Sequence, residues 1–136
     1  MLKLVLLLTA ILISLTTSTR LLAAPCMRVT LTGRQGGPVF QGQARSGTLV
    51  QYGDESNNCG AINLQFDAGR GTTQRLSQAK TPIGKLQAIF FTNLHSDHTE
   101  GLAAMMQSHW HFDSAGPKVD LVCIVCLDLI SLQLPQ

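Results

Sequence analysis

Charged residues are scarce in this sequence, and the basic ones do not form a run. Lysine, arginine, aspartate and glutamate together make up 13% of the 136 residues, and the formal net charge is +2. Proteins that track a phosphate backbone by charge usually group their lysines and arginines along the chain. The scattered basic residues therefore favour no nucleic-acid partner.

Several common catalytic signatures are also missing. The glycine-rich stretch over residues 33–47 contains neither a phosphate-cradling G-x-x-x-x-G-K-[ST] motif nor a dinucleotide-binding glycine fingerprint. Ser46 and Ser96 lack the flanking pattern of a nucleophilic serine. The chemistry of this chain must therefore be sought elsewhere, among its histidines and carboxylates.

The first residues are typical of an export signal. Lys3 supplies a positive charge, and residues 4–15 are apolar apart from a threonine and a serine. This run is shorter than the roughly 20 residues that cross a bilayer, so we expect a removable signal over residues 1–24, with an uncleaved anchor as the alternative. The mature protein is then expected to be exported to the periplasm or secreted, without a stable membrane span.

Four cysteines would then meet an oxidising compartment. Cys26, Cys59, Cys123 and Cys126 permit disulfides, but their spacing does not assign the pairs. The last two form a C-x-x-C inside an apolar, strand-like run and not at the start of a helix. Packed thiols are therefore expected there in preference to a redox motif.

The order of the patterned segments predicts an α/β fold. Alternating or continuous apolar runs, typical of strands, occur at residues 27–32, 48–52, 61–66, 86–92 and 119–134. Helical patterns occur at residues 72–78 and 99–109. The second and third strands are joined by a polar loop, which favours an antiparallel pair, and strand–helix units follow. This order is typical of an α/β architecture.

The densest group of possible metal ligands follows the strand at residues 86–92. Asn93, His95 and Asp97 alternate, so in an extended segment their side chains leave on the same side, and His98 follows where the chain can turn into a helix. Two imidazoles and a carboxylate suit a zinc-type ion. Because two histidines do not complete a zinc shell, a solvated loop remains the alternative.

The sequence around these residues, TNLHSDHTEGL, resembles the T-H-x-H-x-D-H-x-x-G-L signature of metallo-β-lactamase-fold hydrolases. Upstream, LTGRQGGPVFQGQARSGTLVQYG and LQFDAGRGTTQRL resemble the glycine-rich loop and the D-x-G segment of the branch containing ribonuclease Z and arylsulfatase-like enzymes. The resemblance covers about residues 27–122. It implies the N-terminal half of a metallo-β-lactamase-type αβ/βα sandwich, as a partial domain over residues 25–136.

This resemblance also implies roles for individual residues. His95 would bind a first zinc ion, while Asp97 and His98 would bind a second, so one or two Zn²⁺ ions are expected. Asp97 would also orient the attacking water as the general base, and Asp67 would hold the metal loop without binding metal. The implied reaction is hydrolysis of a sulfate, phosphoester or related ester bond in a small-molecule substrate.

The chain departs from the signature in ways that leave other hypotheses open. Asn93 stands where the first histidine is expected, and an amide oxygen is a weaker zinc ligand than imidazole. The family's remaining ligands come from sequence beyond the signature, which this chain does not reach. One alternative is therefore a non-catalytic remnant with weak or no metal binding. Another is a small exported metal-binding protein using His95, His98, His109 and His111, although the last two are expected to be a surface pair near a helix end.

Overall fold

The computed structural model describes residues 23–37, 42–113 and 115–123. The strands are β1 (Pro25–Gly33), β2 (Gly47–Asp54), β3 (Ile62–Phe66), β4 (Ala88–Phe91) and β5 (Asp120–Cys123). The helices are α2 (Thr72–Gln78), α3 (Ser96–Thr99) and α4 (Leu102–Asp113), with short 3-10 helices η1 (Glu55–Asn57) and η2 (Ile83–Lys85). Residues 1–22 of the expected export signal and residues 124–134 of the last apolar run lie outside the described residues.

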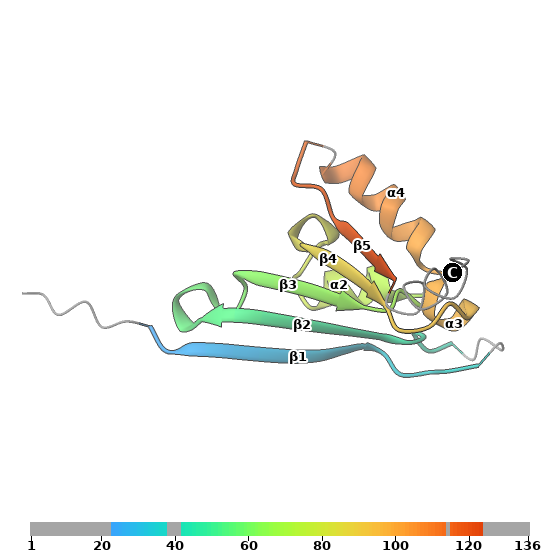
Figure 1. Cartoon of the computed structure of the whole chain (residues 1–136), viewed down its shortest axis with the longest axis horizontal. Coiled ribbons are helices and arrows are strands. Elements are labelled where there is room, and N and C mark those ends of the chain that lie inside the picture. The colour runs from blue at the N-terminus through green and yellow to red at the C-terminus, as the bar shows by residue number, and fades with distance from the viewer. Residues whose placement is uncertain (1–22, 38–41, 114, 124–136) are drawn as a thin grey trace, which may run out of the picture.

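The strands form one mixed sheet in the order β1-β2-β3-β4-β5 (Figure 1). The pairs β1–β2 and β2–β3 are antiparallel, whereas the pairs β3–β4 and β4–β5 are parallel. Parallel neighbours need a crossover, which α2 and η2 supply between β3 and β4, and α3 and α4 supply between β4 and β5. The predicted α/β class and the antiparallel β2–β3 pair are confirmed.

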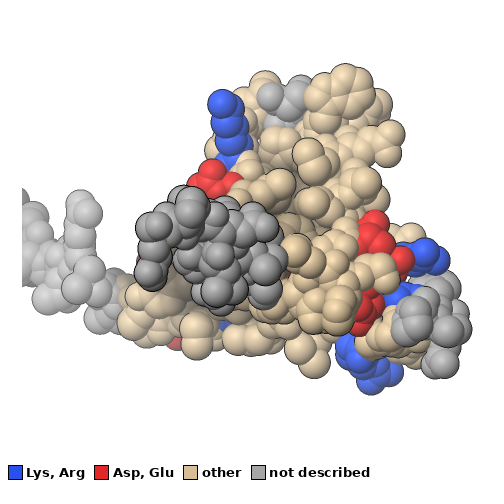
Figure 2. All heavy atoms as spheres, turned by 45° about the vertical axis from the view of Figure 1, so that its right-hand side comes forward, with Lys and Arg blue, Asp and Glu red and all other residues tan. Residues whose placement is uncertain are grey.

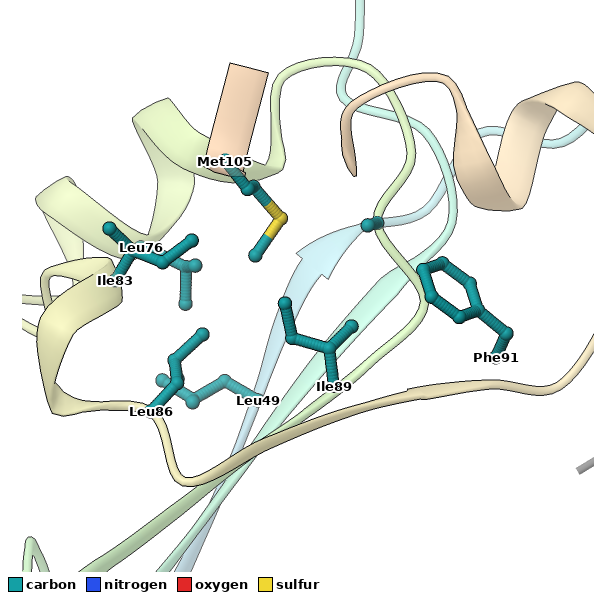
Figure 3. Close-up of a cluster of buried hydrophobic side chains, with 8 residues drawn as sticks. Leu49, Leu76, Ile83, Leu86, Ile89, Phe91 and Met105 are labelled. Carbon is teal, nitrogen blue, oxygen red and sulfur yellow. The ribbon is translucent and has the colours of Figure 1, made fainter. Parts of the chain in front are cut away.

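The apolar core lies on the side of the sheet that the helices cover (Figure 3). Alternation along β2 and β4 turns Leu49 and Ile89 toward this side, where Leu76 of α2 and Met105 of α4 meet them. The members of the cluster are Leu49, Ala68, Leu76, Ile83, Leu86, Ile89, Phe91 and Met105. Helical periodicity and strand alternation therefore converge on one buried layer.

The opposite face of the antiparallel strands is apolar as well, but it is open to solvent. Met27, Val29 and Leu31 of β1 are 68%, 58% and 68% exposed, and Tyr52 and Ile62 on the neighbouring strands are 51% and 43% exposed. The register places Met27 opposite Tyr52 and Tyr52 opposite Ile62, so these side chains share one face. In the part of the chain that the structure describes, no helix is both long and apolar enough to cross a membrane.

A disulfide ties the start of β1 to the turn after η1. Cys26 and Cys59 form this bond across 33 residues of sequence. Cys123, at the end of β5, is disulfide-bonded too. The expectation of a packed thiol at Cys123 is therefore wrong, because its sequence pattern reports strand formation and not the position of a second sulfur.

Candidate functional site

Two loops meet at the edge of the sheet where the parallel strands β3 and β4 end. Ala68, just after β3, donates its N–H to the carbonyl of His98 at 2.7 Å, and Gly101 donates its N–H to the carbonyl of Ala68 at 2.7 Å. A Cβ on Gly101 would lie 2.3 Å from the carbonyl oxygen of Gly69, and one on Gly69 would lie 2.4 Å from the carbonyl oxygen of Asp97. Glycine is thus required at both positions for this close approach.

Asp67 is the buried carboxylate at the centre of this junction. It is 7% exposed, and its φ of 58° is a left-handed conformation that aspartate tolerates better than most residues. Thr92 donates its backbone N–H to Oδ1 at 2.9 Å and its hydroxyl to Oδ2 at 2.7 Å. The Asp67 carboxylate thereby fixes the chain immediately after β4, where the histidine-containing loop begins.

His98 lies between Asp67 and Asp97. Its Nδ1 is 2.9 Å from Asp67 Oδ2, a close contact that is not aligned as a hydrogen bond, while its Nε2 is 3.7 Å from Asp97 Oδ2. Ser46 Oγ also approaches Nε2, at 3.4 Å. A carboxylate behind one ring nitrogen leaves the other free for a ligand, which is the usual arrangement around metal-binding histidines.

Asp97 is held by the glycine-rich loop that precedes β2. Gly37 donates its backbone N–H to Asp97 Oδ2 at 3.0 Å. This hydrogen bond lowers the pKa of the Asp97 carboxyl below its usual value, and the neighbouring charges of His98 and His95 act in the same direction. The carboxylate is therefore ionised at neutral pH, as a metal ligand must be.

His95 and Asn93 take different places beside this junction. The side chain of His95 is exposed and lines a cavity of about 370 Å³ with Gly37, Ser96 and Asp97. Asn93 Oδ1 accepts the backbone N–H of His95 at 2.8 Å. The Asn93 side chain therefore shapes the turn into α3, the local role that asparagine commonly has in turns.

The side chains present fit a divalent ion as an incomplete set of ligands. Asp97 and the Nε2 atom of His98 offer two donors of the types that zinc takes, with Asp67 behind the histidine. Among the described residues, however, no group of three or more His, Cys, Asp or Glu side chains is gathered closely enough to hold a metal ion. The predicted set of His95, Asp97 and His98 is therefore brought together only in part.

The other two histidines lie apart from this junction. His109, in α4, has its Nε2 atom 3.2 Å from the carbonyl of Pro117, and His111 packs edge-on against Phe112. His111 is exposed, as predicted for a residue near the helix end. A single four-histidine metal site is not formed in the described chain.

Three contributors to the site carried no recognisable signal in the sequence. They are the Gly37 amide that binds Asp97, the Ser46 hydroxyl near His98, and Arg45, which is 1% exposed. Arg45 Nε lies 2.9 Å from Glu100 Oε1, and Arg45 also donates to the carbonyl of Gly37. Apart from the Arg45–Gly37 bond, these contacts join segments more than fifty residues apart, beyond the reach of periodicity or short motifs.

Comparisons with known proteins show what this chain is similar to. No family model matches the sequence. Ribonuclease Z from Thermococcus onnurineus is 46% identical over 45 residues, covering 33% of this chain and 14% of that protein. Ribonuclease BN from Cronobacter sakazakii is 32% identical over 82 residues, covering 60% of this chain and 26% of that protein. The chain thus spans about a quarter or less of the length of these curated relatives.

Solved structures of known proteins can also be compared with the fold of this chain. The metallo-β-lactamase-fold protein YhfI from Bacillus subtilis matches with a TM-score of 0.55 and 27% identity, covering 68% of this chain and 34% of that one. The chain has the metallo-β-lactamase fold and is ribonuclease Z-like. Human tRNase Z, short form, matches with a TM-score of 0.56 and 23% identity, covering 79% of this chain and 39% of that one. What is described here corresponds to part of the metallo-β-lactamase fold.

The relatives contradict the expectation of a small-molecule ester substrate and no nucleic-acid partner, because they are named as ribonucleases. That expectation rested on the absence of a basic run in the sequence. The fold, however, gathers Arg34, Arg70 and Arg75 from separate segments around two adjoining cavities of about 230 and 480 Å³. Charge that is scattered along a chain can thus be concentrated in space. The similarities also favour a hydrolase over the non-catalytic remnant.

Proposed function

We propose that this chain provides part of the active site of a metal-dependent phosphodiesterase that acts on RNA. The observation that carries the proposal is the Asp67–His98–Asp97 arrangement at the strand ends of a ribonuclease Z-like fold. A carboxylate-backed imidazole next to an ionised carboxylate is part of what a hydrolytic metal centre needs from the protein.

In this proposal Asp97 and the Nε2 atom of His98 hold a zinc ion, and His95 faces the same site from the adjoining cavity. A bound zinc ion would supply the Lewis acidity that activates water and polarises a phosphoryl oxygen. Asp67 holds the His98 ring, and the Gly37 amide holds the Asp97 carboxylate. Asp97 is also the proposed acceptor of the proton that the attacking water loses.

The arginine-lined cavities support RNA as the substrate class. The larger cavity is bordered by Arg70 and Arg75 and reaches Glu100 and Gly101 in the loop of the proposed metal centre. Basic and acidic side chains lie side by side at one end of the molecule (Figure 2). An anionic strand could therefore lie along the arginines while a phosphodiester reaches the metal, with affinity that depends on salt.

We also propose that the protein works outside the cytosol. The Cys26–Cys59 disulfide supports this location, since such bonds persist mainly in oxidising compartments.

The metal centre is tested by titrating the purified, metal-free protein with Zn²⁺. Wild type should bind zinc, and Asp97→Ala and His98→Ala should each weaken binding by about 10-fold or more. The control His111→Ala removes an exposed histidine of α4 and should leave zinc affinity unchanged. Equal losses in His98→Ala and His111→Ala would contradict the assignment.

The substrate is tested by measuring cleavage of a single-stranded RNA oligonucleotide with and without zinc. Zinc-dependent cleavage that Asp97→Ala abolishes would support the proposal, whereas zinc binding without RNA cleavage would contradict it. Binding of the same RNA should weaken as salt rises, and Arg75→Gln should reduce the slope of log affinity against log salt by about 0.7 for one lost phosphate contact. Arg28→Gln, at the distant β1 edge beside Asn58, is the matched control.

A further inference from the structure

We propose that Arg45 is a positioning residue that holds Asp97 in place for the metal through the backbone of Gly37. This inference rests on the proposed function for its metal, but the contacts that carry it belong to the chain itself. The connection runs from the Arg45 guanidinium to the Gly37 carbonyl, and from the Gly37 N–H to Asp97 Oδ2 at 3.0 Å. Gly37 therefore accepts a hydrogen bond from Arg45 through its carbonyl and donates one to Asp97 through its N–H.

Burial makes the contacts of the Arg45 guanidinium important for stability. Arg45 is 1% exposed, and a buried guanidinium is costly unless it is paired and hydrogen-bonded. Its Nε atom lies 2.9 Å from Glu100 Oε1, and its backbone N–H donates to the carbonyl of Arg70 at 3.0 Å. Glu100 closes the turn that contains Asp97 and His98, so Arg45 contacts that turn as well as the glycine-rich loop.

The chemistry of the guanidinium suits this bridging role. Its donors lie in a fixed plane and point in different directions, so one side chain can serve a carboxylate and a carbonyl on separate loops. A lysine ammonium is a compact charge without the planar fork and with a shorter reach, so we expect it to lose at least one of the two contacts. Arg45→Lys therefore preserves the charge while removing the bridge.

Gly37 is suited to its part because its backbone is left-handed. Its φ is +83°, a conformation that glycine adopts without the strain that a Cβ brings. No atom of the described residues lies within 4 Å of a Cβ added there, so among them the requirement is conformational and not one of space. The left-handed backbone of Gly37 therefore points its N–H toward Asp97. The hydrogen bond from Arg45 to the Gly37 carbonyl keeps this backbone in place.

The first test uses the nuclear magnetic resonance signal of the Gly37 amide proton in the metal-free protein. A carboxylate acceptor moves such a signal downfield, so Asp97→Asn defines its position when the charged acceptor is gone. Arg45→Lys should move the signal most of the way to that position, while amide signals of β4 stay in place. The control Arg28→Lys changes an exposed arginine bonded to Asn58 and should leave the signal unmoved. An unmoved Gly37 signal in a folded Arg45→Lys protein would overturn the proposal.

The second test measures zinc affinity and the visible spectrum of the Co²⁺-substituted protein. Arg45→Lys should weaken zinc binding by about 10-fold, as loss of an outer contact to a ligand does, and should alter the cobalt bands. The losses from Arg45→Lys and Asp97→Asn should not add, because both act through the same carboxylate. Fully additive losses would overturn the proposal.

If Arg45→Lys does not fold, Glu100→Gln removes the ionic partner of Arg45 from a side chain that is partly exposed. It should move the Gly37 signal in the same direction, and no movement would count against the proposal. If the wild-type protein binds no zinc, the proposed metal centre is wrong. The Gly37 signal still decides whether Arg45 positions Asp97, so the two failures are distinguishable.

Discussion

The two faces of the antiparallel part of the sheet reverse the usual distribution of polar and apolar residues. On the helix-covered face, Gln51 and Asn63 are buried and bonded to each other at 2.8 Å. On the opposite face, Val29 and Leu31 are 58% and 68% exposed. Apolar alternation therefore does not tell which face of a strand is buried, because hydrogen bonding can stabilise polar residues inside.

The covered face stabilises the sheet, whereas the exposed face is available for contacts with other molecules. The covered face combines the apolar cluster around Leu49 with a polar network in which Gln65 and Thr32 pair at 2.9 Å. The exposed face contributes little burial in the described chain, although its side chains are of the types that normally stabilise a core. Matched substitutions on the two faces should therefore have unequal effects on stability.

The largest effect is expected from the apolar cluster. Leu49→Ala removes a side chain that is 0% exposed, and the cavity should cost about 2–5 kcal/mol in the free energy of unfolding. Leu31→Ala makes the same change on the exposed face of the neighbouring strand and should cost within about 0.5 kcal/mol. Urea denaturation monitored by circular dichroism measures both. Equal losses would show that the β1 face is buried in solution.

The next effect concerns the edge strand that carries much of the exposed face. Reducing the Cys26–Cys59 disulfide, or replacing both residues by serine, frees β1 from the turn after η1. The free energy of unfolding should fall by about 2–4 kcal/mol, because the unfolded chain regains conformational freedom. Thermal unfolding of the oxidised protein and the serine variant measures this loss. An unchanged transition would mean that β1 is held by its sheet pairing alone.

A smaller loss is expected from the polar network of the covered face. Gln65 donates through Nε2 to Thr32 Oγ1 and to the carbonyls of Phe66 and Asp67. Gln65→Leu would leave these acceptors unpaired in a buried place and should cost about 1–3 kcal/mol. Gln78→Leu, on the exposed side of α2, is the control and should be nearly neutral. A stabilised Gln65→Leu protein would show that the network is not needed.

The exposed apolar face should affect association more than stability. Replacing Met27, Val29 and Leu31 by threonine keeps strand-forming residues while removing apolar surface. Stability per substitution should change within about 0.5 kcal/mol, while binding of a hydrophobic dye and self-association should both decrease. Light scattering and dye fluorescence provide the measurements. Unchanged dye binding would indicate that these side chains are covered in solution.

The smallest effect is expected at Asp54, the last residue of β2, which caps η1. The Ser56 hydroxyl and the backbone N–H groups of Asn57 and Ser56 lower the pKa of the Asp54 carboxyl. A depressed folded-state pKa stabilises the fold above the unfolded value, near 3.9, and this contribution is lost as pH falls through the folded-state pKa. Asp54→Asn should therefore flatten the fall in melting temperature between pH 5 and pH 2. A steeper fall in the variant would contradict this sign.

Much of the fold was predictable because local periodicity encodes it. The patterns over residues 48–52 and 61–66 predicted β2 and β3, and the helical pattern over residues 99–109 predicted α4. The resemblance to a known signature also predicted that Asp67, Asp97 and His98 belong to one metal site. Their separate roles stay predictions that the proposed variants test.

The sequence by itself determined the strands, the helices and the glycines that let two loops approach. Only the tertiary structure decided that Cys26 pairs with Cys59 and that Arg45 reaches Glu100. It also decided that scattered arginines border common cavities and that the apolar face of β1 is open. The physical reason is that periodicity reports a residue's immediate neighbours, whereas these features depend on contacts between distant segments, which form only when the strands pair.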